Sequence, residues 1–137
     1  MKRRILVADD HVSARKAVGE LIRTLGDDWV LACEADDGQA AVKLAAEAKP
    51  DLVILDVRMP NLDGVRAGCE IRKFLPEVPI LLYSLFGSPQ LDVQARKAGF
   101  QGAVAKPDGA ALLAAIREIF DSQRPDEGAP NPAEQVH

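Results

Sequence analysis

Cysteine, long apolar runs and basic clusters are scarce in this sequence, and each shortage argues against a class of protein. The two cysteines, Cys33 and Cys69, lie far apart and without CxxC spacing, which argues against a metal-thiolate or redox site. No apolar run approaches the roughly 20 residues of a membrane-spanning helix. The net charge is −4 and the longest basic cluster runs from Lys2 to Arg4, so we expect no nucleic-acid-binding surface in this chain.

The residues that are present are typical of an ordinary globular domain. Apolar residues make up 47% of the 137 residues and charged residues 28%, and this length is enough for one buried core. We expect no secretory leader, because the basic N-terminus is followed by only four apolar residues before two aspartates. The prediction is a cytoplasmic protein with one domain over residues 1–120. Residues 121–137 have three prolines among polar residues and are expected to form a disordered tail or the stump of a linker.

Strand-like and helix-like segments alternate along the chain. The apolar runs expected to be strands are residues 5–8, 29–33, 52–55, 80–83 and 103–105. Helical spacing of apolar residues follows each run, and the five helices are expected to end at or before Gly26, Pro50, Pro76, Gly99 and Phe120. Five successive strand–helix units predict an α/β fold with a doubly wound, five-stranded parallel sheet. The common flavodoxin-like strand order, 2-1-3-4-5, places a ligand site at the carboxyl ends of strands one and three.

Polar side chains stand at the ends of four of the predicted strands. Asp9 and Asp10 follow the first strand, Asp56 the third, Ser84 the fourth and Lys106 the fifth. The carboxyl ends of parallel strands share one edge of the sheet, so these side chains are expected to converge. Two carboxylates 4 Å apart repel by about 4 kcal/mol at an effective dielectric near 20, so three together need positive partners. Lys106 supplies one charge, and Mg2+, which binds through carboxylates, waters and phosphate, is the stronger candidate.

Together these groups describe a site for a phosphoryl group. Asp56 is the predicted nucleophile, attacking phosphorus in line while Mg2+ and Lys106 neutralise the phosphoryl oxygens. Ser84 is expected to donate a hydrogen bond to the transferred group. Taken singly, each residue has a plainer explanation, such as a helix cap, a satisfied core hydroxyl or a solvated charge. Their joint placement at four strand ends favours the phosphoryl site.

With these residues in place, the sequence resembles the response regulator receiver domain of two-component signalling over about residues 4–120. The residues that carry the resemblance are Asp9-Asp10, the DxxMPxxDG signature of Asp56, Met59, Pro60, Asp63 and Gly64, the hydroxyl of Ser84, and Lys106-Pro107. The DDH opening, completed by His11, is most similar to receivers joined to LuxR-type DNA-binding domains. The resemblance implies the CheY-like form of the predicted fold.

The resemblance also implies roles for single residues. Asp10 and Asp56 would bind Mg2+ directly, together with the backbone carbonyl of Arg58, and Asp9 would act through water. The bond between Lys106 and Pro107 would be cis. His11 is expected to begin a helix rather than to take part in catalysis.

One position departs from the family pattern. Receivers usually carry Tyr or Phe three residues before the lysine, a ring that turns inward when the hydroxyl residue moves toward the phosphoryl group, and here that position is Ala103. The usual relay to the surface of the fourth helix, fifth strand and last helix therefore cannot run through this residue. Arg58 and Phe86 occupy positions that in the family tune how fast the phosphoryl group is lost.

The function that the resemblance implies is a phosphoaspartate switch. A sensor histidine kinase or phosphotransfer protein would supply the phosphoryl group to Asp56, and an output partner would bind at the surface of the fourth helix, fifth strand and last helix. A homodimer is compatible with this function. The chain would catalyse its own phosphorylation and dephosphorylation without turning over a separate substrate.

Other functions are weighed against this one. A receiver-shaped interaction module without regulated phosphorylation stays open because of Ala103. A hydrolase with Asp56 as covalent nucleophile is disfavoured, since haloacid-dehalogenase-like phosphatases need Asp two residues after the nucleophile, where this chain has Arg58. Dinucleotide binding is weaker still, because no GxGxxG follows the first strand.

Overall fold

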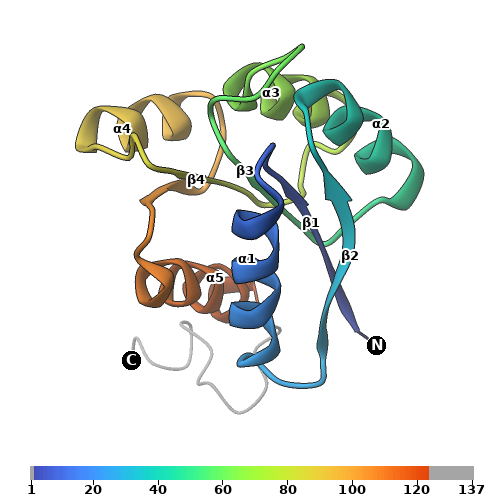
Figure 1. The fold of residues 1–137 in the computed structure, drawn as a ribbon, viewed down its shortest axis with the longest axis vertical. Coiled ribbons are helices and arrows are strands. Elements are labelled where there is room, and N and C mark those ends of the chain that lie inside the picture. The colour runs from blue at the N-terminus through green and yellow to red at the C-terminus, as the bar shows by residue number, and fades with distance from the viewer. Residues whose placement is uncertain (1, 124–137) are drawn as a thin grey trace, which may run out of the picture.

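The computed structural model describes residues 2–123, which form a five-stranded parallel sheet covered by helices on both faces (Figure 1). The strands are β1 (Arg3–Ala8), β2 (Trp29–Ala35), β3 (Leu52–Leu55), β4 (Ile80–Ser84) and β5 (Gly102–Ala105). The helices are α1 (Val12–Arg23), α2 (Gly38–Ala48), α3 (Gly64–Phe74), α4 (Pro89–Lys97) and α5 (Gly109–Gln123). The strand order is β2-β1-β3-β4-β5 and all four pairs are parallel, which confirms the predicted fold.

The central strands are apolar throughout because both faces of the sheet are covered. Every residue of β3 and of β4 is buried. Side chains that alternate along these strands enter two separate cores, one beneath α2, α3 and α4 and the other beneath α1 and α5. Parallel strands buried on both sides read as continuous apolar runs, and this is why β3 shows no alternation in the sequence.

Local capping residues set the start of three helices. Asp37, Asp63 and Ser88 precede α2, α3 and α4, and each side chain accepts a hydrogen bond from the backbone N–H three residues later, at 2.7, 2.9 and 3.1 Å. This is the usual N-cap arrangement, which satisfies one otherwise unpaired N–H of the first turn. His11 is the N-cap residue of α1, which confirms the prediction that it begins a helix, although its side chain makes no capping hydrogen bond.

Gly68 lies in the middle of α3 for a tertiary reason. Glycine inside a helix costs about 1 kcal/mol relative to alanine. A Cβ atom at Gly68 would lie 2.3 Å from the ring of Phe100, which is only 4% exposed. The missing side chain therefore lets the ring that follows α4 pack directly against α3.

Some element boundaries differ from the predicted ones. Strand β1 begins two residues earlier than expected, at Arg3, and β2 continues past Cys33 to Ala35. Helix α5 continues to Gln123, so the predicted domain boundary at residue 120 falls inside this helix. Residues 124–137 of the predicted tail lie outside the described part of the chain. Within residues 2–123, no helix is both long and apolar enough to cross a membrane.

Candidate functional site

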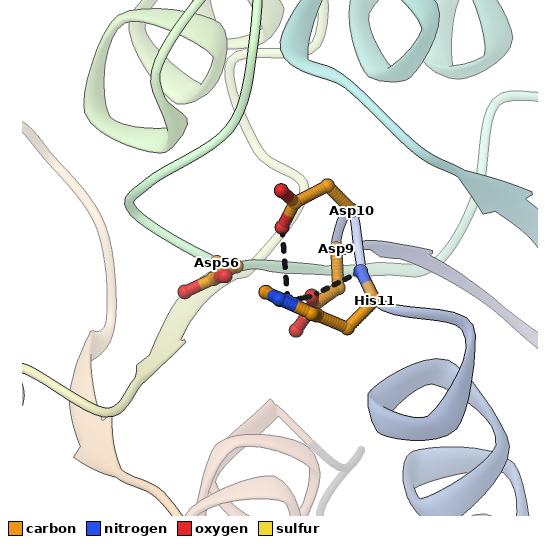
Figure 2. Close-up of side chains that lie close together, drawn as sticks. All are labelled: Asp9, Asp10, His11 and Asp56. Atoms are coloured by element: carbon orange, nitrogen blue, oxygen red, sulfur yellow. Dashed lines mark hydrogen bonds and ion pairs between the residues drawn. The ribbon is translucent and has the colours of Figure 1, made fainter.

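Three carboxylates and an imidazole gather at the carboxyl end of the two central strands. Asp9 and Asp10 follow β1, and Asp56 follows the neighbouring strand β3, with Ala8 and Leu55 paired in register just before them. One ligand atom from each of Asp9, Asp10, His11 and Asp56 lies within 4.8 Å of all the others (Figure 2). The strand order thus brings together groups that are distant in the sequence, as predicted from the strand ends.

Asp56 is nearly buried at the end of β3. The residue is 7% exposed, and its Oδ1 accepts a hydrogen bond of 2.8 Å from the N–H of Val57. Burial is the main reason that the pKa of the Asp56 carboxyl lies above its ordinary value, and the negative charge of Asp9 adds to the effect. Lys106 opposes both, with its Nζ 3.6 Å from Asp56 Oδ2. Ionised Asp56 therefore lies in a setting that favours a nearby cation.

Lys106 offsets only part of this negative charge. Its side chain is 12% exposed and donates a hydrogen bond to Asp9 Oδ2, while the Asp9 side chain is 4% exposed. Among the described residues, the basic group beside Asp10 is the imidazole of His11, with Nδ1 3.1 Å from Asp10 Oδ1. One lysine thus faces three carboxylates, and the remaining oxygens are the hard ligands that a divalent cation prefers. The donor set fits the magnesium site that the sequence predicted.

Ser84 supplies the predicted hydroxyl at the end of β4. The side chain is fully buried, and its Oγ accepts a hydrogen bond of 3.1 Å from the N–H of Phe86. Among the described residues, the Ser84 hydroxyl accepts this hydrogen bond and donates none, so its O–H can donate to a group bound beside it. Strand β4 pairs with β3, so Ser84 and Asp56 end adjacent strands.

The loop between β3 and α3 packs tightly under Asp56. A Cβ at Gly64 would lie 1.9 Å from the backbone oxygen of Asp56, and Gly64 N–H donates to the carbonyl of Val57 at 2.8 Å. This close approach explains why glycine follows Asp63 in the motif. It also fixes the backbone on which the predicted ligand Arg58 lies.

Two contacts around the site were missed from the sequence. The guanidinium of Arg58 lies 4.0 Å from the centre of the Phe86 ring, a cation–π contact between the loops that follow β3 and β4. Arg15 of α1 donates from Nη1 to the backbone oxygen of Asp9 at 2.7 Å and from Nε to Glu34 at 3.1 Å. In each contact the two partners belong to different loops, helices or strands, so no local sequence pattern signals it.

The segment of β5 and the residues after it agrees with the family pattern at Lys106-Pro107 and departs from it at Ala103. The peptide bond between Lys106 and Pro107 is cis, as the resemblance implied. Ala103 carries no ring, and its backbone N–H donates instead to Asp92 Oδ1 of α4 at 2.9 Å. Asp92 Oδ2 accepts from Arg96 Nε at 2.9 Å. A side chain of α4 therefore reaches the strand at the point where the switch residue is absent.

The family model of the response regulator receiver domain matches residues 5–117 of this chain. The chain belongs to the receiver domain family. Receiver domains act as phosphoaspartate switches in two-component systems, and they typically use Mg2+ at an acidic pocket such as the cluster seen here. The predicted family and the general function are confirmed. The roles of single residues stay predictions.

Curated relatives include both short and longer regulators. The receiver domain is 41% identical over 105 residues to the transcriptional regulatory protein PdtaR of Mycobacterium tuberculosis, covering 77% of this chain and 50% of that protein. It is 35% identical over 107 residues to the chemotaxis protein CheY of Thermotoga maritima, covering 78% of this chain and 88% of that protein. The chain thus spans about half the length of PdtaR and most of CheY.

Solved structures agree with the fold. A LuxR-family two-component response regulator from Aurantimonas sp. SI85-9A1 has a TM-score of 0.82 at 30% identity, over 100% of both chains. The CheX–CheY–BeF3–Mg2+ complex from Borrelia burgdorferi has a TM-score of 0.80 at 26% identity, over 86% of this chain and 89% of the other.

Proposed function

We propose that this receiver domain is a phosphoaspartate switch in which Asp56 accepts the phosphoryl group. The observation that carries the proposal is the position of Asp56. It is a nearly buried carboxylate at the end of a central strand, with Lys106 3.6 Å away and two further carboxylates beside it. Such a site suits a reaction in which the protein contributes mainly positioning and charge stabilisation.

The proposed reaction moves one phosphoryl group. The free carboxylate oxygen of Asp56 attacks phosphorus in line, a P–O bond forms, and the P–N bond of a donor phosphohistidine breaks as the donor imidazole leaves. Lys106 stabilises the charge on the phosphoryl oxygens, and the Ser84 hydroxyl donates a hydrogen bond to one of them. Attack of water on phosphorus later releases phosphate and restores the Asp56 carboxylate.

The residues proposed to hold Mg2+ are Asp10 and Asp56 with the backbone carbonyl of Arg58, and Asp9 through water. When bound, the cation supplies positive charge next to the phosphoryl oxygens. Asp10 is the most exposed carboxylate of the cluster, at 34%, and is therefore open to a hydrated ion. The CheX–CheY complex from Borrelia burgdorferi contains Mg2+ together with BeF3, which supports the same use of the pocket here.

A sensor histidine kinase or a phosphotransfer protein is the proposed donor, and a cytoplasmic location is part of the proposal. The proposed output surface is formed by α4, β5 and α5. Three apolar side chains in α4 and in the loop before it are exposed, with Leu85 68%, Phe86 55% and Val93 52% exposed. Exposed apolar side chains in this region are available to a protein partner. A homodimer through this surface is part of the proposal.

Acetyl phosphate with Mg2+ tests the acceptor. Intact-protein mass spectrometry should show a gain of one phosphoryl group in the wild type and none in Asp56→Ala. Asp36→Ala is the matched control, because Asp36 is an exposed aspartate outside the cluster, and it should gain the group as the wild type does. Equal gains in the wild type and Asp56→Ala would show that the acceptor is another residue.

A second candidate function is an interaction module that binds its partner without regulation by phosphorylation. The hydrogen bond from Ala103 N–H to Asp92 favours it, because α4 is held to β5 without a movable ring. Amide NMR spectra with and without beryllofluoride separate the two functions. Chemical shift changes across residues 85–99 support the switch, and their absence supports the constitutive module.

A further inference from the structure

His11 is part of the acidic cluster, although its position in the sequence suggested only a helix start. Its backbone N–H donates to Asp9 Oδ1 at 2.9 Å, which turns the residue back toward the end of β1. The imidazole then lies between the carboxylates of Asp9 and Asp10, with Asp56 beside them (Figure 2). Its side chain is 69% exposed, so packing does not force the ring into this place.

The distance from the ring to Asp10 is that between neighbouring ligands of one ion. His11 Nδ1 lies 3.1 Å from Asp10 Oδ1 and 3.3 Å from Asp9 Oδ1. In an octahedral site with metal–ligand distances of about 2.1 Å, adjacent ligands are about 3.0 Å apart and opposite ligands about 4.2 Å apart. All four ligand atoms lie within 4.8 Å of one another, which is wider than one octahedron, and this group includes Asp9, which is proposed to act through water.

Hydrogen bonding alone explains these distances less well. One ring N–H can point at only one of the two carboxylates, and N–H···O bonds usually measure roughly 2.7–3.2 Å. The contact to Asp9 at 3.3 Å is longer than that, and Asp9 already receives Lys106 and the His11 backbone N–H. In the tautomer that carries its proton on Nε2, the lone pair of Nδ1 can therefore serve a cation shared with Asp10.

We propose that His11 Nδ1 is a ligand of the divalent cation in this site, together with the neighbouring aspartates. This inference rests on the metal site of the proposed function and adds a nitrogen donor to it. A nitrogen donor selects for cations softer than Mg2+, because imidazole binds first-row transition metals better than it binds Mg2+. The site should accordingly prefer Mn2+ over Mg2+ more strongly than a site made of carboxylates alone.

Mn2+ is the probe that tests the ligand directly. It is paramagnetic, and as a hard cation it is bound weakly by the thiols of Cys33 and Cys69. Pulsed electron paramagnetic resonance of the wild type with Mn2+ should show coupling to a 14N nucleus of imidazole, and His11→Asn should lack the imidazole signal. Asparagine is a good N-cap, so this variant keeps the start of α1. His137→Asn, which changes the chain's second histidine, should keep the signal.

Affinity measurements give a second readout. Loss of His11 should weaken Mn2+ binding by about tenfold, in the range seen when groups that support a metal are removed. The Mg2+ dissociation constant should change by less than about twofold, since Mg2+ prefers oxygen and water ligands. Isothermal titration calorimetry at fixed pH measures both constants.

The outcomes separate this inference from the proposed function. Mn2+ binding that Asp10→Asn abolishes, without 14N coupling in the wild type, would overturn the role of His11 and leave the carboxylate site standing. Equal losses of Mn2+ and Mg2+ affinity in His11→Asn would overturn the selectivity. A wild type that binds neither ion would overturn both the ligand and the metal site on which it rests.

Discussion

Asp56 is placed where its chemistry and the stability of the fold make opposite demands. The carboxylate must be ionised to attack phosphorus, yet it is nearly buried and faces the charges of Asp9 and Asp10. The raised pKa of Asp56 reflects this cost, which comes from burial first and from Asp9 second. Lys106 reduces the cost without removing it. Functional sites often hold charges of this kind at the expense of stability.

Removing the Asp56 charge should therefore stabilise the domain. Asp56→Asn keeps the size of the side chain and an oxygen that can accept the N–H of Val57, but it removes the buried charge. The free energy of unfolding at pH 7 without metal should rise by roughly 0.5–2 kcal/mol. Urea denaturation in EDTA measures it, with Asp36→Asn as the control that should change little. A lower stability of Asp56→Asn would show that the Lys106 pairing outweighs the repulsion.

Helix α4 and strand β5 are joined by a contact that depends on one carboxylate. Strand β5 is an edge of the sheet, and its outer N–H groups need partners other than a neighbouring strand. Asp92 supplies one by accepting from Ala103 N–H, while its other oxygen accepts from Arg96. These bonds, with the backbone N–H first, hold the pKa of Asp92 below its ordinary value. In this chain the contact occupies the region where related receivers place a ring.

This contact predicts a pH-dependent stability. A carboxyl with a depressed pKa in the folded state contributes stability above its unfolded pKa, about 3.9, and loses it as the pH falls through the folded value. Asp92→Ala should therefore lower the free energy of unfolding at pH 7 by about 1 kcal/mol, as for a partly exposed hydrogen bond. Thermal denaturation from pH 7 to pH 3 should show this difference shrinking below about pH 4. A difference that stays constant to pH 3 would contradict a role for the Asp92 charge, and Asp92→Asn, which keeps an acceptor, should lose less.

At the scale of the whole domain, the carboxylate cluster exists only when the sheet is formed. Asp10 and Asp56 belong to separate strands, and pairing of β1 with β3 brings them together. An ion that binds both residues binds the folded chain far better than the unfolded chain. Metal binding and folding are then linked by mass action.

Mg2+ should accordingly raise the melting temperature. At a concentration 100 times the dissociation constant, the folded state gains about 2.7 kcal/mol. For a domain of this size that corresponds to a shift on the order of 10 °C. Differential scanning calorimetry with and without Mg2+ measures it, and Asp10→Asn should reduce the shift strongly. A similar shift in the variant would place the ion elsewhere.

The sequence by itself determined every feature that depends on local pattern. The apolar run of β3, the caps Asp37, Asp63 and Ser88, and the residues after each strand are readable without coordinates, because period and turn chemistry are properties of neighbouring residues. Five strand–helix units indicated a parallel sheet, and the order common to such sheets was the one found, which brings Asp9, Asp56 and Lys106 together. The ends of β2 and α5 were placed two and three residues short, since pairing and packing extend them.

Only the tertiary structure decided the contacts between distant elements. Gly68 reads as a weak point of a helix until the ring of Phe100 is seen against it. His11 and Arg15 carry no local signal for their approach to Asp9, and Asp92 carries none for Ala103. The contact of His11 depends on how the chain turns after β1, and the others depend on how the helices pack on the sheet. Local pattern thus determined which groups reach the edge of the sheet, and packing decided which of them touch.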